Sequence, residues 1–193
     1  MESLIAFTGT DFVLCLGSTG RARGIMMLVN DQDKLHEVHG NIIALTDDGS
    51  GDGAQFLEYI KANINLTTFR NSLELSTHET SNFIRSEIAR SLRKDPKSVN
   101  CLIAGIDKEK PSLYWIDYLG TLVKLEKAAH GYASKFCSSV LDRRCHENLT
   151  LDEGLTIVRE CIQVLETRFL VNAPNFICKI ITKDGIQIID LNE

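Results

Sequence analysis

Strand-like and helix-like segments of this chain occur in blocks rather than in alternation. Four β-rich runs come first and two amphipathic helices follow; three more β-rich runs, two more helices and a closing hairpin complete the order. Such blocks are typical of α+β layering, whereas a parallel sheet needs strands that alternate with helices. Two strand blocks and two helix pairs to cover them predict a four-layer αββα sandwich, with two antiparallel sheets between two helical layers.

The β-rich runs are bounded by residues that favour turns. Asp184 and Gly185 separate the last two runs and are typical of a two-residue hairpin turn. A strand is also expected within the first residues of the chain. The expected strands span residues 4–7, 12–16, 35–38, 42–45, 99–104, 112–116, 121–125, 176–181 and 186–189.

Four helices are expected from apolar positions that recur with helical spacing. Two of them begin with a capping box, in which Ser or Thr is followed three residues later by Glu: Ser76 with Glu79, and Thr150 with Glu153. The third helix covers about 134–143. The first helix covers about 53–69, and the second ends at Asp95 and Pro96. The residues expected to face the core are Phe56, Leu57, Ile60 and Ile64 in the first helix, Ile84, Ile88 and Leu92 in the second, and Leu155, Val158, Ile162, Leu165 and Phe169 in the fourth.

Length and charge limit the kinds of partner. The 193 residues suit one domain that spans 1–193, and the net charge is −5. Basic residues are scattered in pairs rather than gathered in a stripe, which argues against nucleic acid or an anionic membrane as a partner. Neither a signal peptide nor a membrane span of about 18 apolar residues is present in the sequence. We expect a soluble intracellular protein with protein or small-molecule partners.

The six cysteines lie singly in apolar runs and are expected to be buried free thiols. Cys145 is followed by His146, which raises the question of a zinc site. Zinc ligands come in spaced pairs, and the other histidines do not supply a second pair, so no metal is expected. The cysteines are Cys15, Cys101, Cys137, Cys145, Cys161 and Cys178, and the other histidines are His36, His39, His78 and His130.

Two polar segments could each be either a binding site or a solvent-exposed turn. The acidic segment 47–53 lacks the Gly-Lys-Ser/Thr that a phosphate-binding loop needs. An EF-hand calcium loop is flanked by helices, whereas a strand precedes this segment. A solvated turn is therefore favoured over both kinds of site. Arg21 and Arg23 lie in a segment that could contact a substrate, although a solvated turn is again favoured. The polar faces of the second helix could meet either solvent or a neighbouring protein.

Four stretches of the sequence resemble the proteasome beta-subunit family, and within it a non-catalytic branch. The resemblance covers essentially the whole chain, and its most discriminating parts are Ile-Asp-Tyr-Leu-Gly-Thr and Ala-His-Gly-Tyr. It implies the αββα fold of the N-terminal nucleophile hydrolases. The stretches are residues 51–64, 100–105, 114–121 and 129–132.

The same resemblance implies that the catalytic residues are missing. Active family members attack the peptide carbonyl with an N-terminal threonine, whose free amine can act as the base. Met1 stands at that position here, and a thioether cannot attack a peptide bond. The family's aspartate after the second strand is matched to Gly17, and the nearest match for its lysine, Lys34, is one residue out of register.

Further positions of the family's active site also differ. The oxyanion-stabilising glycine aligns with Asp48, whose charge, next to that of Asp47, would oppose a developing oxyanion. The family's Gly-Ser-Gly turn is Gly-Tyr-Ala at residues 131–133, and its Asp-x-x-Ser-Gly-Gly segment is replaced at residues 169–174. We therefore expect no catalytic residue, cofactor or metal.

A structural subunit of the beta ring is the function that the resemblance implies. Its expected partners are other beta subunits of the ring, alpha-ring subunits and beta subunits of the opposite ring, in the cytoplasm and nucleus. The mature chain is expected to keep Met1. One alternative is a peptidase that exposes Ser3 by trimming, but Glu2 disfavours removal of the methionine and the differences at Gly17 and Asp48 would remain. A free-standing adaptor with this fold is the other alternative.

Overall fold

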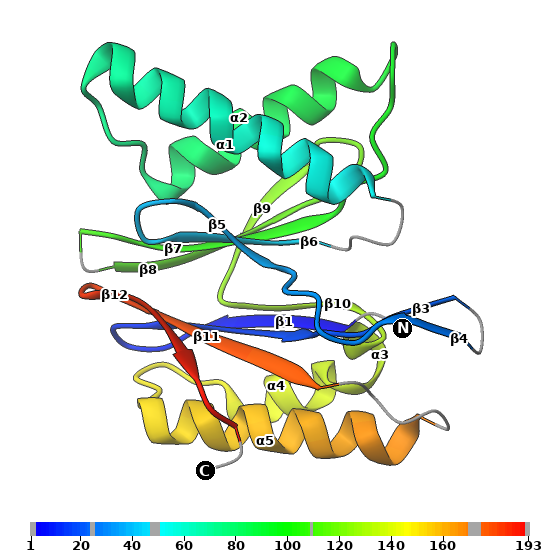
Figure 1. The fold of residues 1–193 in the computed structure, drawn as a ribbon. Coiled ribbons are helices and arrows are strands. Elements are labelled where there is room, and N and C mark those ends of the chain that lie inside the picture. The colour runs from blue at the N-terminus through cyan, green and yellow to red at the C-terminus, as the bar shows by residue number, and fades with distance from the viewer. Residues whose placement is uncertain (1–2, 24–25, 47–50, 109, 170–174, 192–193) are drawn as a thin grey trace.

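The structure, a computed structural model, describes residues 3–23, 26–46, 51–108, 110–169 and 175–191, which form four layers (Figure 1). Helices α1 (Asp52–Asn71) and α2 (Thr77–Ser91) cover one five-stranded sheet. The other five-stranded sheet packs against this one, and the remaining helices cover its outer face. The expected αββα sandwich is confirmed.

Both large sheets are antiparallel throughout. The first has the strand order β10-β1-β2-β11-β12, with β1 Ser3–Thr8, β2 Val13–Ser18, β10 Lys127–Gly131, β11 Phe176–Thr182 and β12 Gly185–Ile189. The second has the order β5-β6-β7-β8-β9, with β5 Leu35–His39, β6 Ile42–Thr46, β7 Cys101–Asp107, β8 Lys110–Ile116 and β9 Leu122–Leu125.

All nine expected strands are present, and three further strands were not expected. The short strands β3 (Arg21–Arg23) and β4 (Met26–Val29) pair in a separate sheet, so the interpretation of Arg21 and Arg23 as part of a turn was wrong. Strand β10 carries the chain from one large sheet to the other directly after β9. Its mixed composition gave no alternating pattern, and its pairing with β1 defines it as a strand.

The final hairpin turns one residue earlier than expected. Thr182 pairs with Gly185, so Lys183 and Asp184 form the turn and Gly185 begins β12. Gly185 has a φ of 132°, a backbone conformation that is readily available only to glycine. The glycine therefore allows the strand to start immediately after the turn.

The helices begin where the capping boxes predict. The backbone N–H of Ser76 donates to Glu79 Oε2 (2.8 Å) at the start of α2, and that of Thr150 donates to Glu153 Oε2 (2.9 Å) at the start of α5 (Leu151–Arg168). The expected helix over 134–143 is divided at Cys137 into α3 (Ala133–Phe136) and α4 (Ser138–Arg144).

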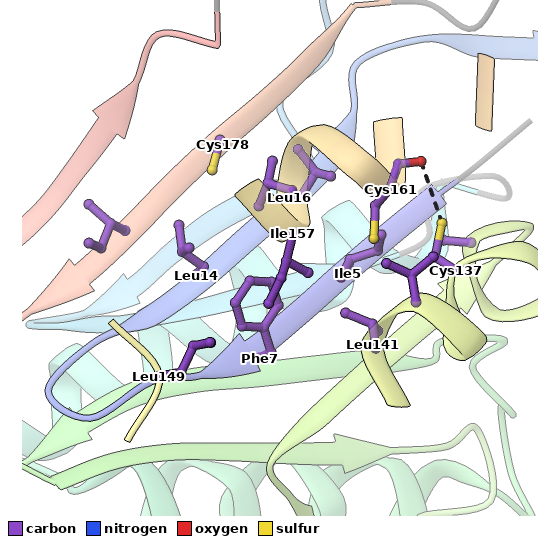
Figure 2. Close-up of a cluster of buried hydrophobic side chains, with 14 of the residues drawn as sticks. Ile5, Phe7, Leu14, Leu16, Cys137, Leu141, Leu149, Ile157, Cys161 and Cys178 are labelled. Atoms are coloured by element: carbon purple, nitrogen blue, oxygen red, sulfur yellow. Dashed lines mark hydrogen bonds between the residues drawn. The ribbon is translucent and has the colours of Figure 1, made fainter. Parts of the chain in front are cut away.

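Three apolar layers hold the sandwich together. Strand β1 contributes alternate residues to two of them: Leu4 and Ala6 face the other sheet, whereas Ile5 and Phe7 face the helices (Figure 2). Because both faces of the inner strands are covered, their sequences are apolar runs rather than alternating patterns. The third layer lies between the second sheet and α1 and α2, where Ile60 and Ile88 are fully buried as expected.

The buried face of α5 is rotated relative to the expected stripe. Val158 and Leu165 are buried as expected, but Ile162 is only half-buried. Gly154 lies on the buried side, and a Cβ atom there would come within 2.8 Å of Leu14 Cδ1. The rotation follows from this close approach between helix and sheet. The buried residues of α5 are Gly154, Ile157, Val158, Cys161 and Leu165.

All six cysteines are free, as expected, and all but the half-buried Cys145 are buried. Burial raises the pKa of Cys101 and of Cys178 to about 12, and that of Cys145 to about 11. Cys137 Sγ donates to the carbonyl oxygen of Cys161 at 3.6 Å, which ties α3 to α5 (Figure 2). Thiols with raised pKa values are poor nucleophiles, so Cys101, Cys145 and Cys178 act as packing residues.

The described residues contain neither a cluster of metal ligands nor a helix that could span a membrane. Within ranges 3–23, 26–46, 51–108, 110–169 and 175–191, no group of three or more His, Cys, Asp or Glu could hold a metal ion. No helix in these ranges is both long and apolar enough to cross a membrane.

The capping boxes predict a loss of stability in acid. Hydrogen bonds from Ser76 and Thr150 hold the pKa values of Glu79 and Glu153 below the ordinary 4.5. The two ionised carboxylates therefore stabilise the fold above about pH 4.5, and this contribution is lost as the pH falls through their lowered pKa values. The variant Glu79→Gln/Glu153→Gln keeps an acceptor at each cap but does not titrate there.

We expect the free energy of unfolding, measured by urea titration between about pH 6 and pH 3, to fall more in the wild-type chain than in this double variant. The control is Glu58→Gln, at an exposed position inside α1. Equal pH dependence of the wild type and the double variant would contradict the capping account.

Candidate functional site

The candidate site is the end of the sandwich where β1 begins, because the resemblance places the family's nucleophile there. Ser3 is 4% exposed, and its backbone N–H donates to Ser18 Oγ at 3.1 Å. This contact follows from the antiparallel register, in which Leu4 pairs with Gly17. The end of β2 is therefore bonded to the start of β1, with both serines buried.

A side chain at position 17 would not reach the start of β1. A Cβ atom at Gly17 would lie 2.4 Å from Leu35 Cδ1 and 3.3 Å from Leu4 Cδ2, in the apolar layer between the sheets. Ser18 is the residue whose side chain reaches β1. The position matched to the family's aspartate, Gly17, therefore lies against the apolar layer, and the side chain that reaches the start of β1 is the neutral hydroxyl of Ser18.

Lys34 is fully buried just before β5. Its Nζ atom donates to the carbonyl oxygen of Gly20 at 2.8 Å. A buried ammonium is tolerated only when it has hydrogen-bonding partners, and this carbonyl is one of them. Lys34 therefore ties the segment before β5 to the segment that follows β2.

Lys179 is a second buried lysine that the sequence analysis missed. It lies on β11, and its Nζ atom donates to the Leu35 carbonyl at 2.8 Å and lies 2.8 Å from Asp33 Oδ2 and 3.5 Å from Glu37 Oε1. These contacts join one large sheet to the other beside Lys34. The signal in the sequence was a single lysine within the apolar run Phe-Ile-Cys-Lys-Ile-Ile.

An aromatic cluster occupies the place of the family's Gly-Ser-Gly turn. Tyr132 meets Phe169 edge-on, with ring centroids 5.3 Å apart, and Phe136 meets the same ring at 5.7 Å. Edge-on pairs of this kind are favourable, so the cluster fixes the start of α3 to the end of α5. Gly131 has a φ of 65° and ends β10.

Several residues singled out in the sequence lie outside the described residues. These are Met1, Glu2, Asp47, Asp48 and residues 170–174. The candidate site is therefore built from Ser3, Ser18, Thr19, Gly20 and Lys34. Their contacts link backbone segments to one another: an amide to a hydroxyl, and an ammonium to a carbonyl.

The chain is similar to proteasome subunits over its full length. The family model "Proteasome subunit" matches residues 2–181. The "Probable proteasome subunit beta type-4" of Schizosaccharomyces pombe is 42% identical over 194 residues, covering 99% of this chain and 100% of the relative. The "Proteasome subunit beta type-2" of Dictyostelium discoideum is 41% identical over 196 residues, covering 100% and 98%. The "Proteasome subunit beta type-4" of Saccharomyces cerevisiae is 39% identical, covering 98% of each chain.

The contacts of Lys179 predict a measurable loss of stability when they are removed. In Lys179→Met the Leu35 carbonyl loses its donor and the ion pairs disappear. Breaking a fully buried ion pair costs roughly 3–5 kcal/mol. Asp33 and Glu37 have side chains that are 44% and 56% exposed and can stay hydrated, so we expect the smaller loss of about 2 kcal/mol.

Urea unfolding of the isolated chain, followed by circular dichroism, measures this loss. Lys183→Met, at an exposed position in the next turn, is the matched control and should change stability by less than about 0.5 kcal/mol. If both variants unfold at the same urea concentration as the wild type, Lys179 does not join the sheets energetically.

Proposed function

Because the chain belongs to the proteasome subunit family, with beta-type relatives over its full length, we propose that it is a non-catalytic structural subunit of the beta ring of the proteasome core particle. One observation carries the non-catalytic part: the residue matched to the threonine of active members is Met1, and neither Glu2 nor Ser3 after it is a threonine. The relatives include subunits named beta type-2, the branch of the family that the sequence resembles.

The environment of the candidate site supports this proposal. Beside the start of β1, the neutral hydroxyl of Ser18 accepts a hydrogen bond from the backbone N–H of Ser3. Lys34, the nearest match for the family's activating lysine, donates to the Gly20 carbonyl. Residues that would tune a nucleophile in an active member thus have structural contacts in this chain.

The proposed role is to complete the ring. A closed cyclic assembly needs every member, because each subunit supplies two different faces to its neighbours. This subunit contacts adjacent beta subunits, the alpha ring and the opposite beta ring, and works in the cytoplasm and nucleus. The active neighbours then face a sealed chamber in which protein substrates are degraded.

Cleavage by Ser3 is the alternative that the structure disfavours. Ser3 is 4% exposed within β1, and its N–H is used in the hydrogen bond to Ser18. A nucleophile must be reached by the substrate, and its free amine must be able to accept a proton. Ser3 is instead a buried residue at the start of β1.

A covalent probe tests the proposal. Core particles are purified through an affinity tag on the C-terminus of this chain and treated with a peptide epoxyketone, which reacts with N-terminal threonine residues. We expect active beta subunits to copurify and to gain the mass of the probe, while this chain keeps its unmodified mass with Met1 retained.

The labelled neighbours are the internal control, because they show that the probe and the particle are active. The variant Met1→Thr should also remain unlabelled, since Ser18 supplies no carboxylate at the position beside β1. Probe attached to the wild-type chain, or a mature chain that begins at Ser3, would overturn the non-catalytic assignment. Absence of other proteasome subunits from the purified material would overturn membership of the ring.

A further inference from the structure

Two buried cysteines meet where the helices of one outer layer contact each other. Cys137 lies at the junction of α3 and α4, and Cys161 lies on the buried face of α5. Cys137 Sγ donates to the Cys161 carbonyl oxygen at 3.6 Å, although 24 positions separate the two residues in the sequence. Figure 2 shows both side chains in the space between α5 and this junction.

The two thiols also interact with each other. A hydrogen bond from the Cys161 side chain holds the pKa of the Cys137 thiol below its ordinary value. The same hydrogen bond, together with burial, raises the pKa of Cys161. Cys137 therefore loses its proton more readily than Cys161, and a second thiol lies within hydrogen-bonding reach of the resulting thiolate. A low-pKa thiol beside a resolving thiol is the arrangement of redox-sensing cysteines.

The other four cysteines do not share this arrangement. Cys101 lies in the layer beneath α1 and α2, and Cys15 lies in the layer between the sheets. Cys178 belongs to the same apolar cluster as the pair, but it lies apart from it on β11 (Figure 2). Cys145 acts on Cys161 only through its charge. Among the six cysteines, all of which the structure describes, one pair is placed to react together.

The geometry of the pair suits a disulfide better than a metal site. A structural zinc ion takes four ligands, and the described ranges contain no group of three or more His, Cys, Asp or Glu that could hold a metal ion. A disulfide needs only two cysteines whose Cα atoms lie within about 7 Å. Because the sulfur of Cys137 already reaches the main chain of Cys161, a bond between them requires no rearrangement of the helices.

An oxidant has only a short way to reach Cys137. The thiol is fully buried, but the next two residues, Ser138 and Ser139, are exposed, so Cys137 lies directly beneath the surface. Helix α3 has four residues, which is too few for a helix to be stable without packing contacts. Local opening of this turn uncovers the sulfur while the sheets stay folded. Hydrogen peroxide is small enough to enter through such an opening.

From these observations we propose that Cys137 and Cys161 form a reversible disulfide when the protein meets hydrogen peroxide, which joins the α3–α4 junction covalently to α5. The proposal goes beyond ring assembly and does not depend on ring membership. Permanent disulfides are rare in the cytoplasm, where glutathione and thioredoxin keep thiols reduced. Two free thiols in contact suit a bond that forms under oxidant and is reversed by these reductants.

The reaction is a two-electron oxidation. The Cys137 thiolate attacks one oxygen of the peroxide and the O–O bond breaks, which leaves a sulfenic acid on Cys137. The released hydroxide takes up the proton that Cys137 lost and becomes water. The Cys161 sulfur then attacks the sulfur of the sulfenic acid, the S–O bond breaks, and the leaving hydroxide takes the Cys161 proton as a second water. Two thiols and one peroxide thus become one disulfide and two waters.

Peptide mapping of the oxidised chain tests the proposal. The purified full-length chain is reduced, freed of reductant, and treated with a small excess of hydrogen peroxide. Its remaining thiols are then blocked, and it is digested with trypsin without reductant. Cleavage after Lys and Arg places Cys137, Cys145 and Cys161 in the separate peptides 136–143, 145–159 and 160–168. We expect peptides 136–143 and 160–168 to be linked, and dithiothreitol to separate them.

Thermal unfolding gives a second readout with matched variants. A disulfide removes freedom from the unfolded chain, so the oxidised wild type should melt roughly 5–10 °C above the reduced wild type. Cys145→Ala should keep both the link and this difference in melting temperature. Cys137→Ala should lose both, and its melting transition in the reduced form shows whether it is folded.

Several results would overturn the proposal. These are unlinked peptides in the peroxide-treated wild type, sulfinic acid on Cys137 in place of the link, and a link that involves Cys145. A link between 136–143 and 160–168 that forms no more selectively in the folded chain than in urea would also overturn it. The map of the wild type is decisive whether or not a variant folds, and none of these results bears on the proposed function, which the epoxyketone probe tests.

Discussion

The apolar character of both faces of both sheets is the constraint from which the rest of the structure follows. In β1 and β2 almost every residue is buried, so each strand needs one cover from the other sheet and one from helices. Burial of apolar surface contributes roughly 25 cal/mol per Å² and is the main stabilising contribution to such a fold. The four layers are the arrangement that covers all of these faces. Helix α5 lies so close to its sheet that its contact with Leu14 requires a glycine at position 154.

Polar groups within this apolar interior need hydrogen-bonding or ionic partners inside the protein. Lys179 crosses between the sheets to Asp33, Glu37 and the Leu35 carbonyl, and Lys34 reaches the Gly20 carbonyl. These contacts hold the strand ends where active members of the family carry out their chemistry. At the start of β1 the Ser18 hydroxyl likewise satisfies the backbone N–H of Ser3.

The sequence predicted the layers well, because apolar periodicity and capping boxes report directly on burial and helix starts. It did not predict β3 and β4, since strand pairing outside the core depends on how the chain is anchored at Thr19 and Lys34 rather than on an alternating pattern. The contact of Ser18 with the start of β1 was not predicted, because it depends on the register of β1 with β2. Lys179 was missed because its partners lie more than 140 residues away in the sequence.

The central claim is that this chain acts by completing a ring and not by cleaving peptides. Depletion of the chain from cells, followed by measurement of every peptidase activity of the core particle, tests this claim most directly. The account predicts that all activities fall together with the amount of mature core particle, including those of active sites on other subunits, because a ring cannot close without one of its members. Mature and fully active core particles at normal abundance after depletion would contradict it.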